Sequence, residues 1–185
     1  MQQVYDFRTK LEVSKIRQDR DISVLWRVFP QARHIRPGSE TEDKKGSDYI
    51  VDIGPFWRKV DVKAREPGCS RFWSKDDTGE PLPELAIELV SVHGARTGWA
   101  LDWAKHTDYL MFTFDPTDWP YCYVVPALAI RQMTERFESY MRRNFQVSMQ
   151  TSGLWTSECV FVPINKIAEG IVASWKFRYA EEQAS

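Results

Sequence analysis

The distribution of polar and apolar positions predicts a helix at the N-terminus, followed by a polar loop. Over residues 4–29 the apolar side chains recur at mixed three- and four-residue spacing, which is typical of one face of a helix. Pro30 ends this run, because proline cannot continue the hydrogen bonding of a helix. Residues 31–47 are polar and contain the turn signal Pro37-Gly38, so we expect them to form a loop.

Three β-rich runs follow this loop. Tyr49 to Ile53 and Trp57 to Ala64 flank the turn signal Gly54-Pro55 and predict a hairpin. Residues 66–83 are rich in Gly, Pro, Ser and Asp and predict a long connection. Leu85 to Val92 is almost continuously apolar, as in a central strand that is covered on both faces. We expect this strand to extend the hairpin into a three-stranded meander.

The second half of the chain continues with short strands and helices. The predicted elements are a short helix over Gly98 to Lys105, strands over Tyr109 to Phe114 and Tyr121 to Val125, a helix from Pro126 to about Asn144, a strand over Leu154 to Val162 and a helix from about Asn165 to Trp175. This order predicts an α/β sandwich with a mixed sheet, in which residues 1–185 form a single domain. Its core would span about residues 10–125, with a C-terminal extension over 126–185.

Composition is that of an ordinary soluble protein. The chain has 185 residues, of which 43% are apolar and 28% charged. It opens with no apolar signal segment and contains no run of about 18 apolar residues, so we expect a cytoplasmic protein without a membrane span. The three cysteines are far apart and odd in number, which indicates neither a zinc site nor a disulfide framework.

Charge is balanced overall but unevenly distributed. The net charge of −1 gives no global basic signature for nucleic acid. Residues 1–36 nevertheless hold eight Arg and Lys against four acids, whereas residues 37–90 hold twelve acids against eight bases. Two readings are open: an acidic metal site beside a phosphate-binding rim, or a mixed surface with no such role.

The predicted hairpin brings three charged residues to one face. Asp61 and Lys63 are two residues apart on a strand, so both project from the same side. A turn centred between Gly54 and Pro55 places Asp48 directly opposite Asp61, with Cβ atoms about 4.5–5.5 Å apart. Two carboxylates this close repel each other unless a cation lies between them, and Mg²⁺ prefers such oxygen ligands. A lysine beside them would stabilise negative charge that develops on a phosphate.

These residues resemble the PD-(D/E)xK nuclease superfamily. Asp48 matches the first acid of its pattern and Asp61-Val62-Lys63 the second element, although Ser47 stands where the family name has proline. Over roughly residues 10–125 the resemblance implies a restriction-endonuclease-like αβββαβ core. It also implies that Asp48, Asp61 and the carbonyl of Val62 bind Mg²⁺ or Mn²⁺, and that Lys63 assists hydrolysis of DNA.

Two further acids are candidates for the same site. Glu88 lies in the middle of the apolar run, where an unpaired carboxylate would be costly, so it either joins the metal site or pairs with an arginine at the sheet edge. The family often takes another acid from its first helix. Asp21 is the best candidate, with Asp19 and Glu12 as competitors, and the alternative for each is a solvated helix face.

The sequence thus predicts a Mg²⁺-dependent deoxyribonuclease, of a size that would suit a phage or mobile element. A domain this small would need to act as a homodimer to cut both strands of DNA together. Two alternatives remain open: a catalytically inactive nuclease-fold protein that serves as an inhibitor or assembly factor, and an interaction protein with an aromatic binding surface. In either case Asp61 and Lys63 could be an ordinary ion pair beside a solvated Asp48.

Overall fold

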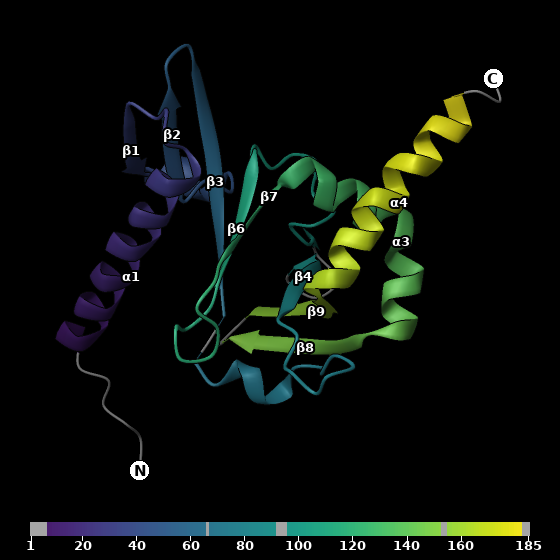
Figure 1. Ribbon diagram of the computed structural model, residues 1–185. Coiled ribbons are helices and arrows are strands. Elements are labelled where there is room, and N and C mark those ends of the chain that lie inside the picture. The colour runs from purple at the N-terminus through teal and green to yellow at the C-terminus, as the bar shows by residue number, and fades with distance from the viewer. Residues whose placement is uncertain (1–6, 66, 92–95, 153–154, 183–185) are drawn as a thin grey trace.

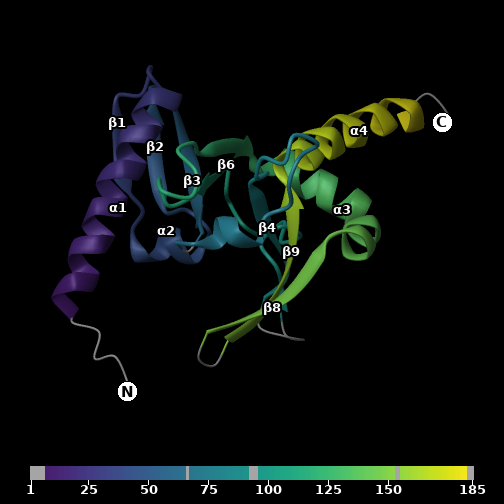
Figure 2. The same cartoon turned by 60° about the horizontal axis from the view of Figure 1, so that its bottom comes forward.

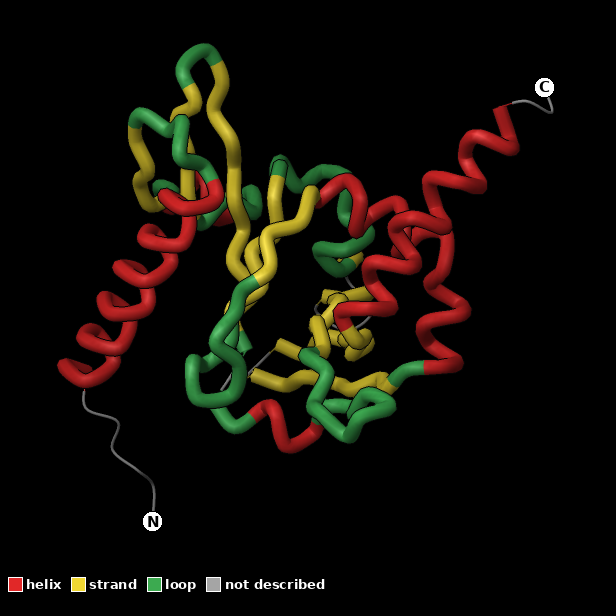
Figure 3. Tube along the Cα trace, in the orientation of Figure 1, coloured by secondary structure: helices red, strands yellow, loops and turns green. Residues whose placement is uncertain are grey.

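A computed structural model describes residues 7–65, 67–91, 96–152 and 155–182, which form two β-sheets with helices around them (Figures 1 and 3). The five-stranded sheet has the order β1 (His34–Pro37), β2 (Tyr49–Ile53), β3 (Phe56–Ala64), β6 (Tyr109–Thr113) and β7 (Tyr123–Pro126). The four-stranded sheet has the order β5 (Arg96–Thr97), β4 (Glu84–Ser91), β9 (Trp155–Pro163) and β8 (Gln146–Ser152). The helices are α1 (Phe7–Val28), α2 (Glu40–Lys44), α3 (Ala127–Asn144) and α4 (Ile164–Glu182), with the short 3-10 helix η1 (Cys69–Phe72).

The five-stranded sheet is mixed, as predicted. β3 and β6 run parallel. The other three neighbouring pairs, β1–β2, β2–β3 and β6–β7, are antiparallel. Figure 2 shows α1 and α4 at opposite ends of the molecule, with the sheets between them. The α/β class of the fold is therefore confirmed.

Alternating side chains of the five-stranded sheet supply two separate cores. Tyr49, Val60 and Met111 pack with Leu25 and Phe29 beneath α1. On β6 the neighbours of Met111 point the other way, since successive strand residues face opposite sides. They join a larger core with β4, β9, α3 and α4, whose members include Leu85, Ile87, Leu110, Phe112, Ile130, Val160 and Ile167. Each side chain of this kind that is fully buried stabilises the fold by about 1.5–3 kcal/mol relative to exposure.

The β2–β3 hairpin has the predicted register. Tyr49 pairs with Val60 and Ile53 with Phe56, around the turn at Gly54-Pro55. Gly54 has a positive φ of 73°, which glycine adopts without the strain that a side chain would bring. The register places Asp48, one residue before β2, across from Asp61.

The predicted meander of three strands is wrong. β4 does not pair with β3; it joins the second sheet, where β9 and β5 are its neighbours. The free edge of β3 instead pairs with β6, which is as apolar as β4 and almost completely buried. The long connection from Ala64 to Glu84, which contains η1, carries the chain from one sheet to the other.

Four shorter segments also differ from the prediction. The polar segment 31–47 is not all loop, because it holds β1 and α2. Residues 98–105 form turns instead of a helix, and the Asp102 carboxylate accepts a hydrogen bond from the Ala104 N–H at 2.9 Å. β8 was not predicted, and α4 extends beyond Trp175. The predicted strand began at Leu154, the apolar run ended at Val92 and the first helix began at residue 4, and these three positions lie outside the described residues.

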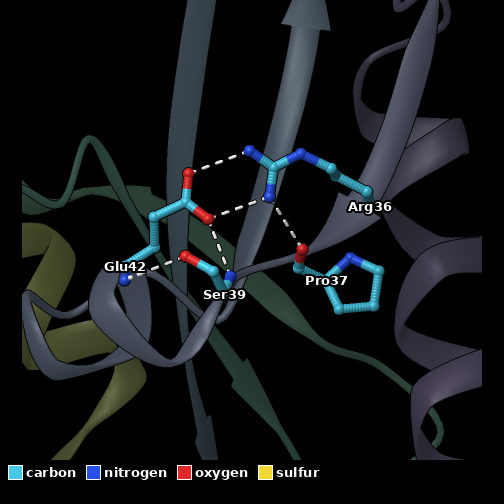
Figure 4. Close-up of polar contacts among 4 residues, drawn as sticks. All are labelled: Arg36, Pro37, Ser39 and Glu42. Carbon is cyan, nitrogen blue, oxygen red and sulfur yellow. Dashed lines mark hydrogen bonds and ion pairs between the residues drawn. The ribbon is translucent and has the colours of Figure 1, made fainter.

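α2 is held in place by a compact polar network (Figure 4). The Ser39 hydroxyl accepts from the Glu42 N–H at 3.4 Å, and the Glu42 carboxylate accepts from the Ser39 N–H at 2.7 Å, which together form a capping box. Arg36 donates two hydrogen bonds of 2.9 Å to the same carboxylate. These donors lower the pKa of Glu42, the Arg36 guanidinium being the largest cause.

No helix among the described residues is both long and apolar enough to cross a bilayer.

Candidate active site

A cavity of about 700 Å³ lies where β3 of the first sheet meets β4 of the second. Five acids line it, namely Asp43, Asp48, Asp61, Glu88 and Asp102. Four lysines line it as well, namely Lys44, Lys45, Lys63 and Lys105. All the residues predicted for the site except Asp21 therefore border one cavity, with Val62 between Asp61 and Lys63.

Asp48 is fixed by the backbone of the opposite strand. Its Oδ2 accepts a hydrogen bond of 2.6 Å from the Val62 N–H. The pKa of Asp48 is raised to about 7, mainly by burial; the nearby charge of Asp61 acts in the same direction, while the Val62 N–H and Lys63 oppose the shift. The cavity therefore favours a proton, or another positive charge, on this carboxylate.

Asp61 and Lys63 form an ion pair within the cavity wall. The Lys63 Nζ lies 2.8 Å from Asp61 Oδ2, and the Asp61 side chain is only 9% exposed. The same ammonium lies 5.2 Å from the centre of the Trp99 ring, a distance at which a cation and an indole face attract. Lys63 is thus oriented by a carboxylate on one side and an aromatic ring on the other.

Glu88 reaches the cavity from the second sheet. Its Oε2 accepts a hydrogen bond of 3.2 Å from the Trp99 N–H, so Trp99 contacts both Glu88 and Lys63. The backbone that brings Trp99 here passes β4 very closely, because a Cβ on Gly98 would lie 2.2 Å from the Glu88 carbonyl oxygen. Only glycine allows this approach. Of the two roles predicted for Glu88, its position fits the one at the cavity.

The structure does not bring Asp21 to the cavity. Asp21 is 3% exposed on the face of α1 that packs against the five-stranded sheet, and it lies on the opposite side of that sheet from Asp61. Its carboxylate lies 3.6 Å from Arg20 and accepts a bond of 3.5 Å from the Tyr49 hydroxyl. Burial raises the pKa of Asp21, and Arg20 opposes this. Of its competitors, Asp19 is exposed, and the side chain of Glu12 lies outside the described residues.

Sequence reasoning missed the contribution of several residues around the cavity. Asp102 and Lys105 were assigned no role, and Trp99, a buried residue of the larger core, also lines the cavity. Arg131 on α3 is buried at 7% exposure. Burial lowers the pKa of Arg131, and the charges of Asp102 and Asp61 oppose this. Its spacing from Ala127 and Thr134, both buried, was the signal that it faces inward.

The donor set of the cavity fits a hard divalent cation in part. Asp48 and Asp61 offer carboxylate oxygens at one wall, which is the chemistry that Mg²⁺ and Mn²⁺ prefer. One Asp61 oxygen is engaged by Lys63, and one Asp48 oxygen by Val62. Within the described ranges, no three His, Cys, Asp or Glu side chains are grouped closely enough to surround a metal by themselves. A cation here would therefore rely on two carboxylates, a backbone carbonyl and water.

Comparisons with protein-family models, with curated proteins and with solved structures give no match to this chain.

Proposed function

We propose that this protein is a metal-dependent nuclease that hydrolyses phosphodiester bonds of DNA. The observation that carries the proposal is the convergence of Asp48, Asp61 and Lys63 on one cavity, with Glu88 entering it from the second sheet. Two carboxylates that face a lysine in a shared cavity match what phosphodiester hydrolysis needs: a place for a cation and a positive charge for the developing phosphorane.

Asp48, Asp61 and the Val62 carbonyl would hold Mg²⁺ or Mn²⁺. When bound, the cation would polarise the phosphate and lower the pKa of an attacking water. Lys63, oriented by Asp61 and Trp99, places its ammonium where negative charge grows. Lys44, Lys45 and Lys105 line the same cavity and would attract the neighbouring phosphates.

The arrangement of the first sheet supports a relationship to the PD-(D/E)xK superfamily as far as β3. α1 precedes the hairpin, with β1 and α2 between them, and Asp48, one residue before β2, faces Asp61 on β3. β4 departs from the expected core, since it delivers Glu88 from a separate sheet. A cut through both strands of a duplex would require two such cavities, and we propose a homodimer for that reaction.

The test is cleavage of DNA by wild type and by Lys63→Ala, with Mg²⁺ or Mn²⁺ and with EDTA. We expect EDTA to stop cleavage, and Lys63→Ala to slow it by roughly a hundredfold or more, on the scale of losing one transition-state stabiliser. Lys166→Ala is the matched control, because Lys166 also forms a 2.8 Å ion pair, with Glu169 on α4, and does not line this cavity. Equal cleavage by wild type and Lys63→Ala would indicate a contaminating nuclease and refute the proposal.

One observation favours a second candidate, a nuclease-fold binding protein without catalysis. The Lys63 ammonium engages an oxygen of Asp61 that a metal would use. If this pair persists in the presence of cation, the cavity is a structural ion-pair cluster. Titration calorimetry with Mn²⁺ separates the two candidates: saturable binding that Asp48→Asn weakens supports the nuclease, and absence of binding supports the second candidate.

A further inference from the structure

Beyond Lys63 the same face of β3 leads to a second cavity. The Arg65 N–H donates to the Thr113 carbonyl at 2.9 Å, so the ladder between β3 and β6 continues past Ala64. Alternate residues of an extended strand share a face and lie about 6.6 Å apart, so Asp61, Lys63 and Arg65 form a row. Arg65 and Ala64 line a cavity of about 420 Å³, next to the one that holds Lys63.

The second cavity combines guanidinium groups with aromatic rings. The Arg65 guanidinium carbon lies 4.5 Å from the centre of the Phe161 ring, and that of Arg71 lies 4.6 Å from the centre of the Phe72 ring. The Phe72 side chain is 63% exposed, although it is large and apolar. Both arginines and both rings line the cavity, together with Pro67 and Gly68.

Among the described residues that line this cavity, two are arginines and one, Glu84, is an acid, so the described lining carries an excess of positive charge. The Glu84 carboxylate is held by Ser74, whose N–H and hydroxyl donate to its Oε1 at 3.0 Å and 2.6 Å. Burial raises the pKa of the Cys69 thiol, which Arg65 opposes, so the thiol next to Arg65 carries a proton and no charge at neutral pH. Within the described residues the Nε of Arg65 is buried and has no hydrogen-bond partner. These features favour an anionic ligand that brings oxygen acceptors.

Residues of both cavities lie close to one cysteine, Cys159. Cys159 on β9 pairs with Glu88 on β4. Burial raises the pKa of the Cys159 thiol to about 11, Glu88 adds to this rise, and both Arg65 and Lys63 oppose it. Lys63 of the first cavity and Arg65 of the second therefore both lie near the buried thiol of Cys159.

We propose that the second cavity binds one unpaired nucleotide adjacent to the bond that is cleaved, with its phosphate on Arg65 and Arg71 and its base stacked on Phe72. Guanidinium groups bind phosphate through paired hydrogen bonds, and an exposed ring stacks on any base that is not paired. A base inside a duplex has no free face for Phe72. The inference rests on the proposed nuclease function and narrows its substrate to a single strand or an unpaired end.

The test compares binding of two fluorescein-labelled probes, a single-stranded oligothymidylate and a duplex of equal length, by anisotropy in Ca²⁺ with the full chain. Arg71 and Phe72 are exposed, so Arg71→Ala and Phe72→Ala leave the packed core intact. We expect wild type to prefer the single strand, and each variant to lose about tenfold in affinity for it, the scale of one base stack or one phosphate contact. Phe56→Ala is the matched control, because its ring is 59% exposed and lies on the hairpin away from this cavity.

Cleavage in Mn²⁺ separates this inference from the proposed function. Cleavage with unchanged single-strand binding in Arg71→Ala and Phe72→Ala overturns the subsite and leaves the nuclease standing. Preference of wild type for the duplex also overturns the subsite. Single-strand binding that depends on Arg71 and Phe72, without cleavage under any metal condition, supports the subsite and refutes the nuclease. Absence of both binding and cleavage refutes both.

Discussion

At the scale of single residues, Asp48 and Asp61 face each other across the β2–β3 hairpin with little access to water. The Asp61 side chain is 9% exposed, and the pKa of Asp48 is raised mainly by burial. Lys63 compensates one of the two charges at 2.8 Å, so the second charge remains as an electrostatic cost of the folded state.

Replacement of Asp48 by asparagine removes this cost. Burial holds the pKa of Asp48 at about 7 in the folded protein, against 3.8 for the unperturbed group. A raised folded pKa gives stability that is present below about pH 4 and is lost as pH rises through 7. Without metal at pH 8, Asp48→Asn should therefore be more stable than wild type by on the order of 1 kcal/mol, since its amide still accepts from Val62.

Urea denaturation of both proteins in EDTA between pH 4 and pH 8 measures this difference. The two stabilities should converge toward pH 4. Asp77→Asn serves as control, because Asp77 is exposed in the long connection and outside the cavity. A wild type whose stability does not fall between pH 4 and pH 8 relative to Asp48→Asn would show that Asp48 is solvated.

Mn²⁺ should reverse the order of the two proteins. A cation that binds the folded state alone stabilises it by about 2.7 kcal/mol at a hundred times its dissociation constant. The wild-type melting temperature should rise with Mn²⁺ concentration, and that of Asp48→Asn much less, because one carboxylate ligand is missing. Thermal melts of both proteins across a Mn²⁺ series test this, and parallel responses would argue against a cation between Asp48 and Asp61.

At the scale of elements, the short helix α2 carries Asp43 and Lys44 to the rim of the cavity. None of the residues of α2 is buried. The helix is held instead by hydrogen bonds that join its Glu42 to Ser39 and Arg36. The chain then turns at Gly46, whose φ is +81° and whose carbonyl accepts from the Thr107 hydroxyl at 2.5 Å. Polar contacts, and not apolar packing, thus determine where this part of the rim lies.

Loss of the cap should loosen α2 measurably. Ser39→Ala removes the side chain that accepts from the Glu42 N–H, and N-cap losses of this kind cost about 0.5–2 kcal/mol. Ser39→Gly is the matched variant, because glycine at an N-cap costs only a few tenths of a kcal/mol. Hydrogen exchange of the α2 amides measures the difference, and exchange should be faster in Ser39→Ala than in Ser39→Gly. Equal exchange in Ser39→Ala and wild type would show that Arg36 alone holds the helix.

The hairpin was predictable because its determinants are local. The turn residues Gly54 and Pro55 fix the centre, and alternation then fixes which side chains share a face, so Asp48, Asp61 and Lys63 follow from the sequence. The pairing of β4 was not predictable, since β6 is an equally apolar partner for β3 and the choice depends on packing across the whole molecule. The prediction that Asp21 joins the site was wrong for a related reason. The periodicity of a helix predicts which of its faces is buried, but not which side of a sheet that face covers.

At the scale of the whole molecule, the cavity is shared between two sheets. Asp48, Asp61 and Lys63 come from the first sheet, and Glu88 and Trp99 from the second sheet and the turn that follows it. Lys44 of α2, Lys45 and Lys105 also line it. Under the proposed function these lysines would meet the phosphates of DNA, although five acids line the same cavity and the chain as a whole has a net charge of −1.

Binding of DNA should accordingly depend strongly on salt. Each phosphate that these cations neutralise releases condensed counterions, so the logarithm of affinity should fall linearly with the logarithm of salt concentration. Anisotropy titrations in Ca²⁺ between low and physiological salt measure the slope, and unfolding curves at the same salt concentrations show that the fold itself is unaffected. A flat response would favour a protein partner over DNA.

The long connection between β3 and β4 has one consequence for how the molecule could be divided. Around Thr78 and Gly79 it forms an exposed turn closed by the Asp76 carboxylate, and no strand passes through it. A single break of the chain there would leave Asp48, Asp61 and Lys63 on one peptide and Glu88, Trp99 and Arg131 on the other. Because β3 and β6 pair across that division, the two peptides would have to reassociate before the cavity exists. If the chain were cut at this turn, the proposed DNA cleavage would be observed only after the two peptides had bound each other.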